Sequence, residues 1–351
     1  MLSFTVFKGA ADGAPVKSTT SKPEQLTGDQ VLLKVLASGV CGTDLHYRKK
    51  DMVLGHEGIG EVLAVGPGAR ALKPGQRVGW GYQTGACGLC AQCFAGDETY
   101  CAGRQMYGQA SPEQGSFATR AVWPEAWLHP IPEGLSSVDA APLQCGGATV
   151  FTALLGVQPT DTVGVFGVGG LGHLAIQFAN KMGCRVVVLS GSDRKKDEAT
   201  RLGGHRFIAT GNLHSKKSKG EEEEDKGQGD VWKLDRLLVT TSALPDWSVV
   251  MPMMAVHGRI VPLSVGGKDL VVPYAPVLLQ GVTVQSALVA TRGVHRAMLA
   301  FAARHGVRPV VETFPLTEEG AREALDRLEK GQVHFRAVLV PEDEDKEKHK
   351  I

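Results

Sequence analysis

Residues 165–173 read VFGVGGLGH, and this stretch decides the fold of the middle of the chain. An apolar run typical of a strand leads into the glycines, and LGHLAIQFANKMG, typical of a helix, follows them. Gly167, Gly169 and Gly172 give the spacing G-x-G-x-x-G, which between a strand and a helix predicts a dinucleotide-binding turn. No Lys-Ser or Lys-Thr pair follows Gly172, which argues against a P-loop. The expected cofactor contacts are the turn itself, Gly167, Val168, Gly169, Gly170, Leu171 and Gly172, unless this is a glycine-rich turn that binds nothing.

The chain has a different character on either side of this turn. From about residue 146, segments such as RVVVLS, KKDEATRLGG and DRLLVTTS alternate between strand and helix, which predicts a doubly wound parallel sheet. From about residue 28 to 145, short β-branched runs such as VLLKVLASGV alternate with Gly and Pro, which predicts a compact all-β region. Two amphipathic helices and a strand follow the α/β part, and we expect them to pack back on the all-β region.

Six of the seven cysteines fall into two metal-ligand patterns. One has the spacing Cys-x2-Cys-x2-Cys-x7-Cys of a closed structural zinc site, formed by Cys87, Cys90, Cys93 and Cys101. The other is scattered along the chain, as the ligands of an open catalytic zinc usually are, and comprises Cys41, His56, Glu57 and Cys145. Two cysteines, one histidine and a water leave a position for substrate. Cys184 is left over, and we expect it to be an ordinary buried thiol.

Composition excludes several classes of protein. The 351 residues suggest two domains, and 38 Lys+Arg against 37 Asp+Glu give no global field for nucleic acid or membrane. The N-terminus lacks a secretory pattern. The apolar stretch from Val163 to Ala179 contains five glycines, which argues against a membrane span. Cysteines in such a chain favour thiolates and metal over disulfides, so we expect a cytoplasmic protein.

The choice between NAD and NADP is read at the end of the next strand, where NAD sites usually carry Asp or Glu. Here the strand ends at Ser190, and small residues and cations follow it: Gly191, Ser192, Arg194, Lys195 and Lys196. Hydroxyls and positive charge suit a 2′-phosphate, which predicts NADP. Asp193 is the contrary feature, and the alternative for the three cations is a solvated helix start.

These motifs together resemble the zinc-containing medium-chain dehydrogenase/reductase (alcohol dehydrogenase) family, and within it the cinnamyl alcohol dehydrogenase-like NADP-dependent branch. The resemblance covers roughly residues 28–340 and includes CGTDLH, GHEGIGEV, PLQCGG, GVGGLG and SGSDRKKDEA. It implies a GroES-like β-rich catalytic domain interrupted by a Rossmann domain. The expected limits are 1–147 for the catalytic part with its zinc lobe at 87–101, 148–289 for the Rossmann NADP-binding domain with a low-complexity insertion at 212–229, 290–340 for the return, and 341–351 for a disordered tail. A homodimer built through the edge of the Rossmann sheet is also implied.

The resemblance also gives individual residues a role. Cys41, His56 and Cys145 match the catalytic zinc ligands, and Glu57 the acidic neighbour that approaches the metal during exchange. Asp44 matches the carboxylate behind the zinc histidine. The remaining matches are Thr43, the hydroxyl that relays a proton, His46, the histidine that exchanges it with solvent, and Arg336, a basic residue near the cofactor phosphates.

We therefore expect a zinc-dependent, NADP(H)-linked alcohol dehydrogenase or aldehyde reductase acting on a small-molecule substrate. Zinc is a Lewis acid for a carbonyl, and a hydroxyl and a histidine suit the accompanying proton transfer. The alternatives are a relative that reduces a conjugated C=C or iminium bond, a non-catalytic NADP-binding relative, and a zinc module for nucleic acid, against which the absence of a basic stripe argues. Trp80, Tyr82 and Gln83 lie before the lobe and belong either to a substrate pocket or to the core. Only fourteen residues separate Cys41 from His56, so the loop 47–54 is shorter than is usual in the family.

Overall fold

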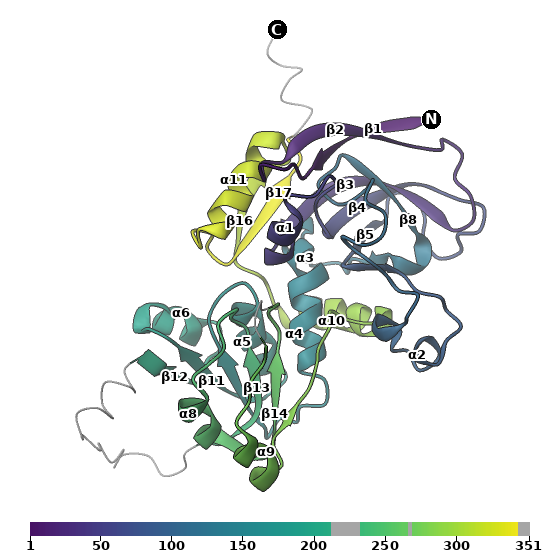
Figure 1. Ribbon diagram of the computed structural model, residues 1–351. Coiled ribbons are helices and arrows are strands. Elements are labelled where there is room, and N and C mark those ends of the chain that lie inside the picture. The colour runs from purple at the N-terminus through teal and green to yellow at the C-terminus, as the bar shows by residue number, and fades with distance from the viewer. Residues whose placement is uncertain (212–231, 266–268, 343–351) are drawn as a thin grey trace. The chain divides into compact units, whose positions relative to one another are not determined.

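The computed structural model describes residues 1–211, 232–265 and 269–342. The chain divides into two compact units, Met1–Ala148 with Val289–Ile351 (unit 1) and Thr149–Leu288 (unit 2) (Figure 1). These limits adjoin the domain boundaries expected at 147/148 and 289/290. The insertion at 212–229 and all but the first two residues of the tail at 341–351 lie outside the described residues.

Unit 1 is built on a seven-stranded sheet to which both the N-terminal and the C-terminal parts of the chain contribute strands. Its order is β16-β17-β3-β4-β5-β9, and β8 also pairs with β3. β17 pairs antiparallel with β3, so the return expected for the C-terminal segment is present. The bounds of the strands are β3 Gln30–Val40, β4 Glu57–Val65, β5 Arg77–Trp80, β8 Arg120–Pro124, β9 His129–Pro130, β16 Val311–Pro315 and β17 Arg336–Val340.

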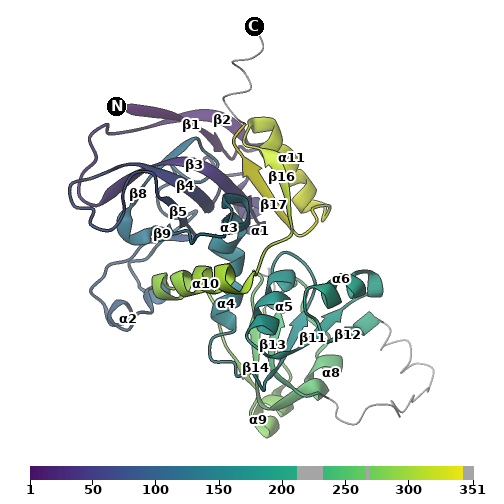
Figure 2. The same cartoon turned by 180° about the vertical axis from the view of Figure 1, so that it is seen from behind.

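The helices of unit 1 follow from their sequence patterns. Ala321, Ala324 and Leu325 form the buried stripe of α11 (Glu318–Glu329), and Thr317 caps its first turn by accepting the N–H of Gly320. α11 lies beside β16 and β17 in both views of Figures 1 and 2. The other helices are α1 Gly42–Tyr47, α2 Ala91–Phe94, α3 Ser137–Pro142 and α10 Arg292–His305.

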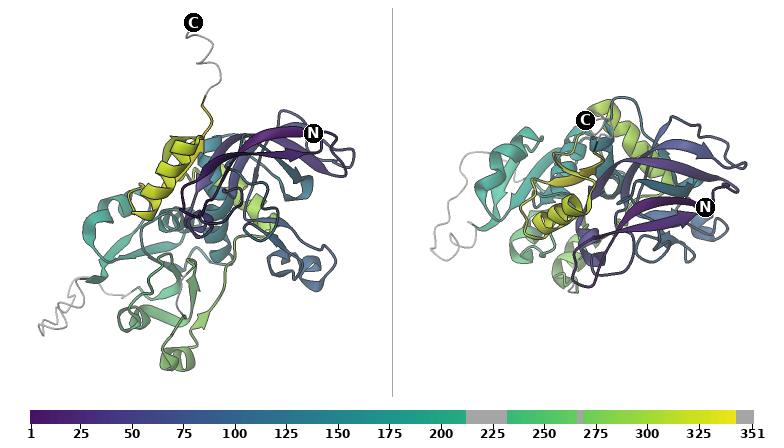
Figure 3. Two further views of the ribbon diagram at one scale, coloured as in Figure 1. Left: turned by 45° about the horizontal axis from the view of Figure 1, so that its top comes forward. Right: turned by 90° about the horizontal axis from the view of Figure 1, so that it is seen from above.

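Two features of unit 1 escaped the sequence analysis. β1 (Leu2–Lys8) and β2 (Val16–Lys22) form an antiparallel pair, seen as two long strands in Figure 3. The alternation that buries Phe4 and Val6 can be seen in the sequence, but it lies before the all-β region expected from about residue 28. β16 has the sequence VETFP, which carries too little apolar alternation to be recognised without its parallel partner β17.

Unit 2 contains the expected parallel sheet, in the order β12-β11-β10-β13-β14-β15. All five pairings are parallel. The central strands are apolar runs because helices cover both faces of such a sheet. The strands are β10 Thr162–Phe166, β11 Arg185–Ser190, β12 Arg206–Ala209, β13 Leu234–Val239, β14 Met254–Pro262 and β15 Thr283–Val284. The helices described after α4 (Ala148–Ala153) are α5 Gly172–Lys181, α6 Lys196–Arg201, α8 Trp247–Val250 and α9 Tyr274–Gln280.

β15 is shorter than the strand expected from VTVQSALVA, because only Thr283 and Val284 pair with β14. In residues 1–211, 232–265 and 269–342, no helix combines the length and the apolar character needed to cross a bilayer.

Candidate functional site

Three separate parts of unit 1 bring the scattered ligand set together. Cys41 follows β3 directly, His56 precedes β4, and Glu57 opens that strand. Cys145 lies in a short π-helix, η3 (Leu143–Gly147), and a π-turn inside a helical segment often marks a functional site. One ligand atom from each of Cys41, His56, Glu57 and Cys145 lies within 4.8 Å of all the others. The structure thus assembles the expected catalytic-type ligand set.

Asp44 orients the histidine of this cluster. Its Oδ1 accepts a hydrogen bond from Nδ1 of His56 at 3.1 Å, and its Oδ2 accepts the backbone N–H of Cys41 at 2.9 Å. The other ring nitrogen, Nε2, lies 3.2 Å from the sulfur of Cys41. With its proton on Nδ1, His56 presents the lone pair of Nε2 to the ligand set, which is the arrangement that a metal-binding histidine requires.

The charges of the cluster suit a divalent cation. The hydrogen bond between the two sulfurs lowers the pKa of Cys41 and raises the pKa of Cys145. Burial alone would lower the pKa of His56, but the charges of Cys41 and Asp44 raise it well above its ordinary value. A zinc ion binds to the same sulfur and nitrogen atoms as a proton, since thiolate and neutral imidazole are zinc ligands. The negative charges that raise the pKa of His56 therefore also favour a divalent cation. The residues present therefore fit zinc.

Glu57 is buried in an ion pair with Arg336. Nη2 of Arg336 lies 2.5 Å from each carboxylate oxygen, and the side chains are 0% and 6% exposed. Burial raises the pKa of Glu57 to about 8, although the arginine opposes this rise. The structure thus holds Arg336 against the carboxylate of the ligand set, and the cofactor-phosphate role expected for it remains a prediction.

The four remaining ligand cysteines form a second cluster. The sulfurs of Cys90 and Cys93 are 3.6 Å apart, those of Cys87 and Cys101 are 3.4 Å apart, and those of Cys87 and Cys93 are 4.0 Å apart. Four thiolates around a tetrahedral zinc stand ~3.8 Å from one another, given Zn–S bonds of about 2.3 Å. The N–H of Leu89, followed by the hydrogen bond with Cys101, lowers the pKa of Cys87 to about 6. This cluster also fits zinc.

The two expected proton-relay residues lie on α1. Thr43 is half-buried in the first turn and donates its backbone N–H to the sulfur of Cys41 at 3.3 Å. His46 is exposed in the last turn. Of the residues whose role was left open, Trp80 belongs to the core of unit 1 and also lines a pocket with His56 and Tyr107. Tyr82 and Gln83 line another pocket, which also includes Trp127 and His129.

The glycine-rich turn of unit 2 has the geometry that its spacing predicts. Gly167 has φ +99°, and a Cβ on Gly172 would lie 2.0 Å from the carbonyl oxygen of Gly167. A Cβ on Gly169 would meet nothing within 4 Å, so the backbone there is open to a ligand. Thr240, at the end of the neighbouring strand, donates to the carbonyl of Phe166 at 2.9 Å. The sequence analysis missed Thr240, since its contact is made across the sheet.

The segment expected to read the 2′-phosphate folds toward this turn. Nζ of Lys195 donates to the carbonyl of Val168 at 2.7 Å. Burial lowers the pKa of this lysine. Nε of Arg194 lies 3.4 Å from Oγ of Ser192, and Ser192, Asp193 and Arg194 are exposed. Lys195 is therefore held beside the glycine-rich turn, whereas Arg194 is exposed on the surface.

The two clusters and the glycine turn define the class of this protein, a zinc-binding dehydrogenase with a separate dinucleotide-binding unit. Comparison with known families agrees. Residues 27–133 match the alcohol dehydrogenase GroES-like domain, and residues 170–304 match the zinc-binding dehydrogenase domain.

Individual relatives extend over almost the whole chain. The NADP-dependent alcohol dehydrogenase 6 of Saccharomyces cerevisiae is 33% identical over 94% of this chain and 93% of its own length. The aldehyde reductase AdhA of Synechocystis is 32% identical over 90% and 93%. Among solved structures, a cinnamyl alcohol dehydrogenase of Sorghum bicolor (SbCAD4) superposes with a TM-score of 0.85 at 30% identity, covering 97% of this chain and 98% of that one. The chain belongs to the zinc-containing alcohol dehydrogenase family of medium-chain dehydrogenases/reductases.

Proposed function

We propose that the protein is a zinc-dependent, NADP(H)-linked alcohol dehydrogenase that interconverts aldehydes and alcohols. The observation that carries this proposal is the pair of ligand clusters in unit 1, of which one has four cysteines and the other has an oriented histidine and a mixed donor set. Four thiolates fill a zinc shell, whereas two thiolates and an imidazole leave room for substrate. Relatives named as alcohol dehydrogenases and aldehyde reductases support the same activity.

Each residue of the open cluster has a part in this proposal. Bound zinc would supply Lewis-acid catalysis for the carbonyl, and NADPH would supply the hydride. Cys41, His56 and Cys145 would hold the metal, and Glu57 is the carboxylate that could approach it when ligands exchange. The hydroxyl of Thr43 passes a proton toward the reacting oxygen, and the exposed imidazole of His46 exchanges that proton with solvent near neutral pH.

NADP is the preferred cofactor in this proposal. The turn from Gly167 to Gly172 takes the pyrophosphate, because the backbone at Gly169 is open to a ligand and the N-terminus of a helix such as α5 favours an anion. Ser190, Gly191 and Ser192 leave space and donors for the 2′-phosphate, to which Arg194 and Lys195 add positive charge. Measuring rates with NADPH and NADH at equal concentration tests this choice, and a preference for NADH contradicts it.

We further propose a homodimer that forms through the edge of the sheet of unit 2. β15 is the edge strand of that sheet, and apolar side chains stand exposed beside it, with Leu278 62% and Leu279 79% exposed. Unpaired edges with exposed apolar surface are typical association sites. We place the enzyme in the cytoplasm, where reducing conditions keep zinc-binding thiolates intact.

An activity screen of purified enzyme tests the proposed reaction. NADPH oxidation should be measured with aromatic, aliphatic and polyol-derived carbonyls, and zinc content should be measured on the same sample. Reduction of aldehydes by the zinc-loaded enzyme is the expected result. Inactive carbonyls together with turnover of a conjugated C=C or iminium substrate would instead identify the protein as a biosynthetic reductase, and no turnover at all would point to a non-catalytic relative.

A further inference from the structure

We propose that Tyr107 is a positioning residue for the metal ligand His56, and that its hydroxyl fixes the geometry of the catalytic zinc site. This inference rests on the proposed function, because it concerns how the same cluster holds its metal. No motif in the sequence marks Tyr107, which lies in an unremarkable stretch after the four-cysteine lobe.

The hydroxyl of Tyr107 shares an acceptor with the histidine. It donates to Oδ1 of Asp44 at 3.0 Å, and Nδ1 of His56 lies 3.1 Å from the same oxygen. The other oxygen of Asp44 accepts the N–H of Cys41. Hydrogen bonds to a carboxylate are stronger and shorter than neutral ones, so three donors fix the plane of this carboxylate. Without the tyrosine hydroxyl, the Asp44 oxygen that orients the imidazole would lose one of its two partners.

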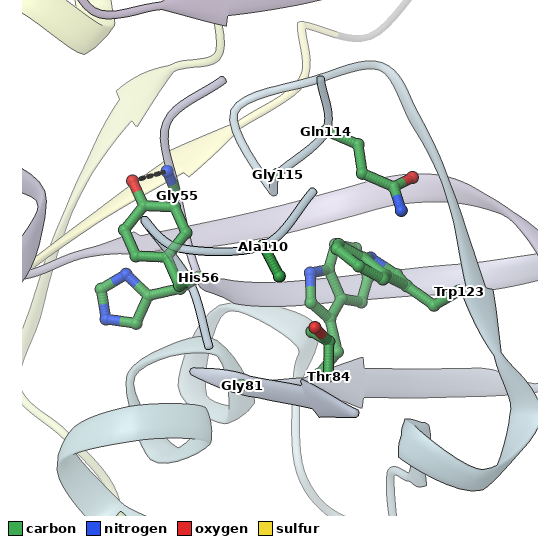
Figure 4. A pocket seen from close by; sticks show the side chains of 10 residues that line it. Gly55, His56, Gly81, Thr84, Ala110, Gln114, Gly115 and Trp123 are labelled. Carbon is green, nitrogen blue, oxygen red and sulfur yellow. Dashed lines mark hydrogen bonds between the residues drawn. The ribbon is translucent and has the colours of Figure 1, made fainter. Parts of the chain in front are cut away.

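The same hydroxyl also holds the backbone in front of the ligand. It accepts the N–H of Gly55 at 2.9 Å, the bond drawn in Figure 4. Gly55 has φ +90°, and a Cβ there would lie 2.4 Å from the side chains of Ser116 and Phe117, so this turn has little freedom. The ring of Tyr107 stacks on the imidazole of His56, with centroids 4.7 Å apart and planes 28° apart. One side chain thus restrains the backbone, the hydrogen-bond partner and the ring plane of the ligand.

The zinc lobe delivers Tyr107 to this position. The lobe opens after β6 (Gln83–Gly85) and closes with β7 (Gln105–Met106), which pairs antiparallel with β6. Tyr107 follows β7 at once, and its N–H donates to the carbonyl of Tyr82 at 2.8 Å. The side chain of Tyr107 is only 6% exposed. The four-cysteine cluster therefore closes the hairpin that presents Tyr107 to the catalytic cluster.

Removal of the hydroxyl alone separates a positioning role from simple packing. Tyr107→Phe keeps the stacked ring and loses both hydrogen bonds. Tyr274→Phe is the matched control, because it removes the hydroxyl of a side chain that is 76% exposed in unit 2. Zinc affinity should be measured on the full chain by competition with a chromophoric chelator, and the visible spectrum should be recorded with Co²⁺ in the catalytic site.

We expect Tyr107→Phe to bind zinc at the catalytic cluster about 10- to 100-fold more weakly, the usual effect of losing a partner behind a metal ligand. Its Co²⁺ spectrum should change, because that spectrum reports ligand geometry, while the lobe keeps its zinc. Tyr274→Phe should behave as wild type. A Tyr107→Phe protein with wild-type affinity and Co²⁺ spectrum overturns the inference.

Two further results keep the outcomes distinct. If Tyr107→Phe also loses the lobe zinc, the substitution has disturbed the lobe, and the inference is tested instead by a crystal structure of the zinc-loaded wild type. A Tyr107 hydroxyl that lies beyond hydrogen-bond distance of Asp44 and Gly55 in that structure overturns the inference. A wild-type protein that binds no metal at the cluster of His56 contradicts the proposed function itself.

Discussion

Replacing Arg336 with leucine should destabilise the protein, because it removes the guanidinium that forms a buried ion pair with Glu57. Both side chains are almost inaccessible, and burial already raises the pKa of Glu57 to about 8 in the presence of the arginine. Breaking a buried ion pair by removing one partner costs about 3–5 kcal/mol. A domain of about 150–250 residues loses roughly 2–4 °C of Tm per kcal/mol, so we expect Tm to fall by at least about 6 °C.

Thermal unfolding of zinc-loaded protein, followed by calorimetry, measures this change. Arg322→Leu is the control, because Arg322 and Glu318 form an exposed i,i+4 pair at 3.3 Å, and such pairs contribute at most about 1 kcal/mol. The double variant Glu57→Leu/Arg336→Leu should recover part of the loss, since paired apolar replacements avoid the buried charge. A Tm for Arg336→Leu within about 2 °C of wild type would refute this reasoning.

Three further predictions concern turnover, cofactor and pH. Thr43→Ala should lower kcat about 100-fold if the hydroxyl relays a proton, and Thr43→Ser should restore most of it; steady-state kinetics showing unchanged turnover would remove Thr43 from the mechanism. Lys195→Ala should raise KM for NADPH about 10-fold, which is the effect of losing one charge-assisted hydrogen bond, and should leave KM for NADH unchanged. Equal changes in KM for both cofactors would contradict a contact between Lys195 and the 2′-phosphate. Burial lowers the pKa of His295 to about 3, so below an unfolded-state value of about 6.5 the unfolded chain binds a proton that the native protein does not. The free energy of unfolding should therefore fall by up to about 1.4 kcal/mol per pH unit as pH drops from about 6.5 toward 5. Denaturant titrations at several pH values should show a weaker dependence of this free energy on pH for His295→Gln than for the wild type. An equal dependence on pH would assign the effect to other groups.

The fold could be predicted from the sequence wherever the pattern of apolar residues was strongly periodic. The run into Gly167 and the helix after it predicted the parallel sheet of unit 2, and the C-terminal strand was expected to return to the first region, where it pairs with β3. β1 and β2 were missed although the alternation of β1 can be seen in the sequence, and β16 was missed because its polar sequence gives little strand signal without its partner β17.

The ligand sets were predictable because metal coordination dictates residue type and spacing. The structure brings Cys41, His56, Glu57 and Cys145 together as expected. Tyr107 and Thr240 could not be predicted, since each acts through hydrogen bonds to residues distant in sequence, and a single tyrosine or threonine forms no recognisable motif. The pairing of Arg336 with Glu57 was likewise visible only in three dimensions.

Zinc content per chain, measured by elemental analysis on wild type and on Cys145→Ala, tests the central claim most directly. We predict two zinc ions in the wild type and one in Cys145→Ala, with aldehyde reduction abolished in the variant while its lobe zinc remains. A wild type that holds one zinc or none, or a Cys145→Ala protein that keeps two and still reduces aldehydes with NADPH, would contradict an open catalytic zinc held by Cys41, His56 and Cys145.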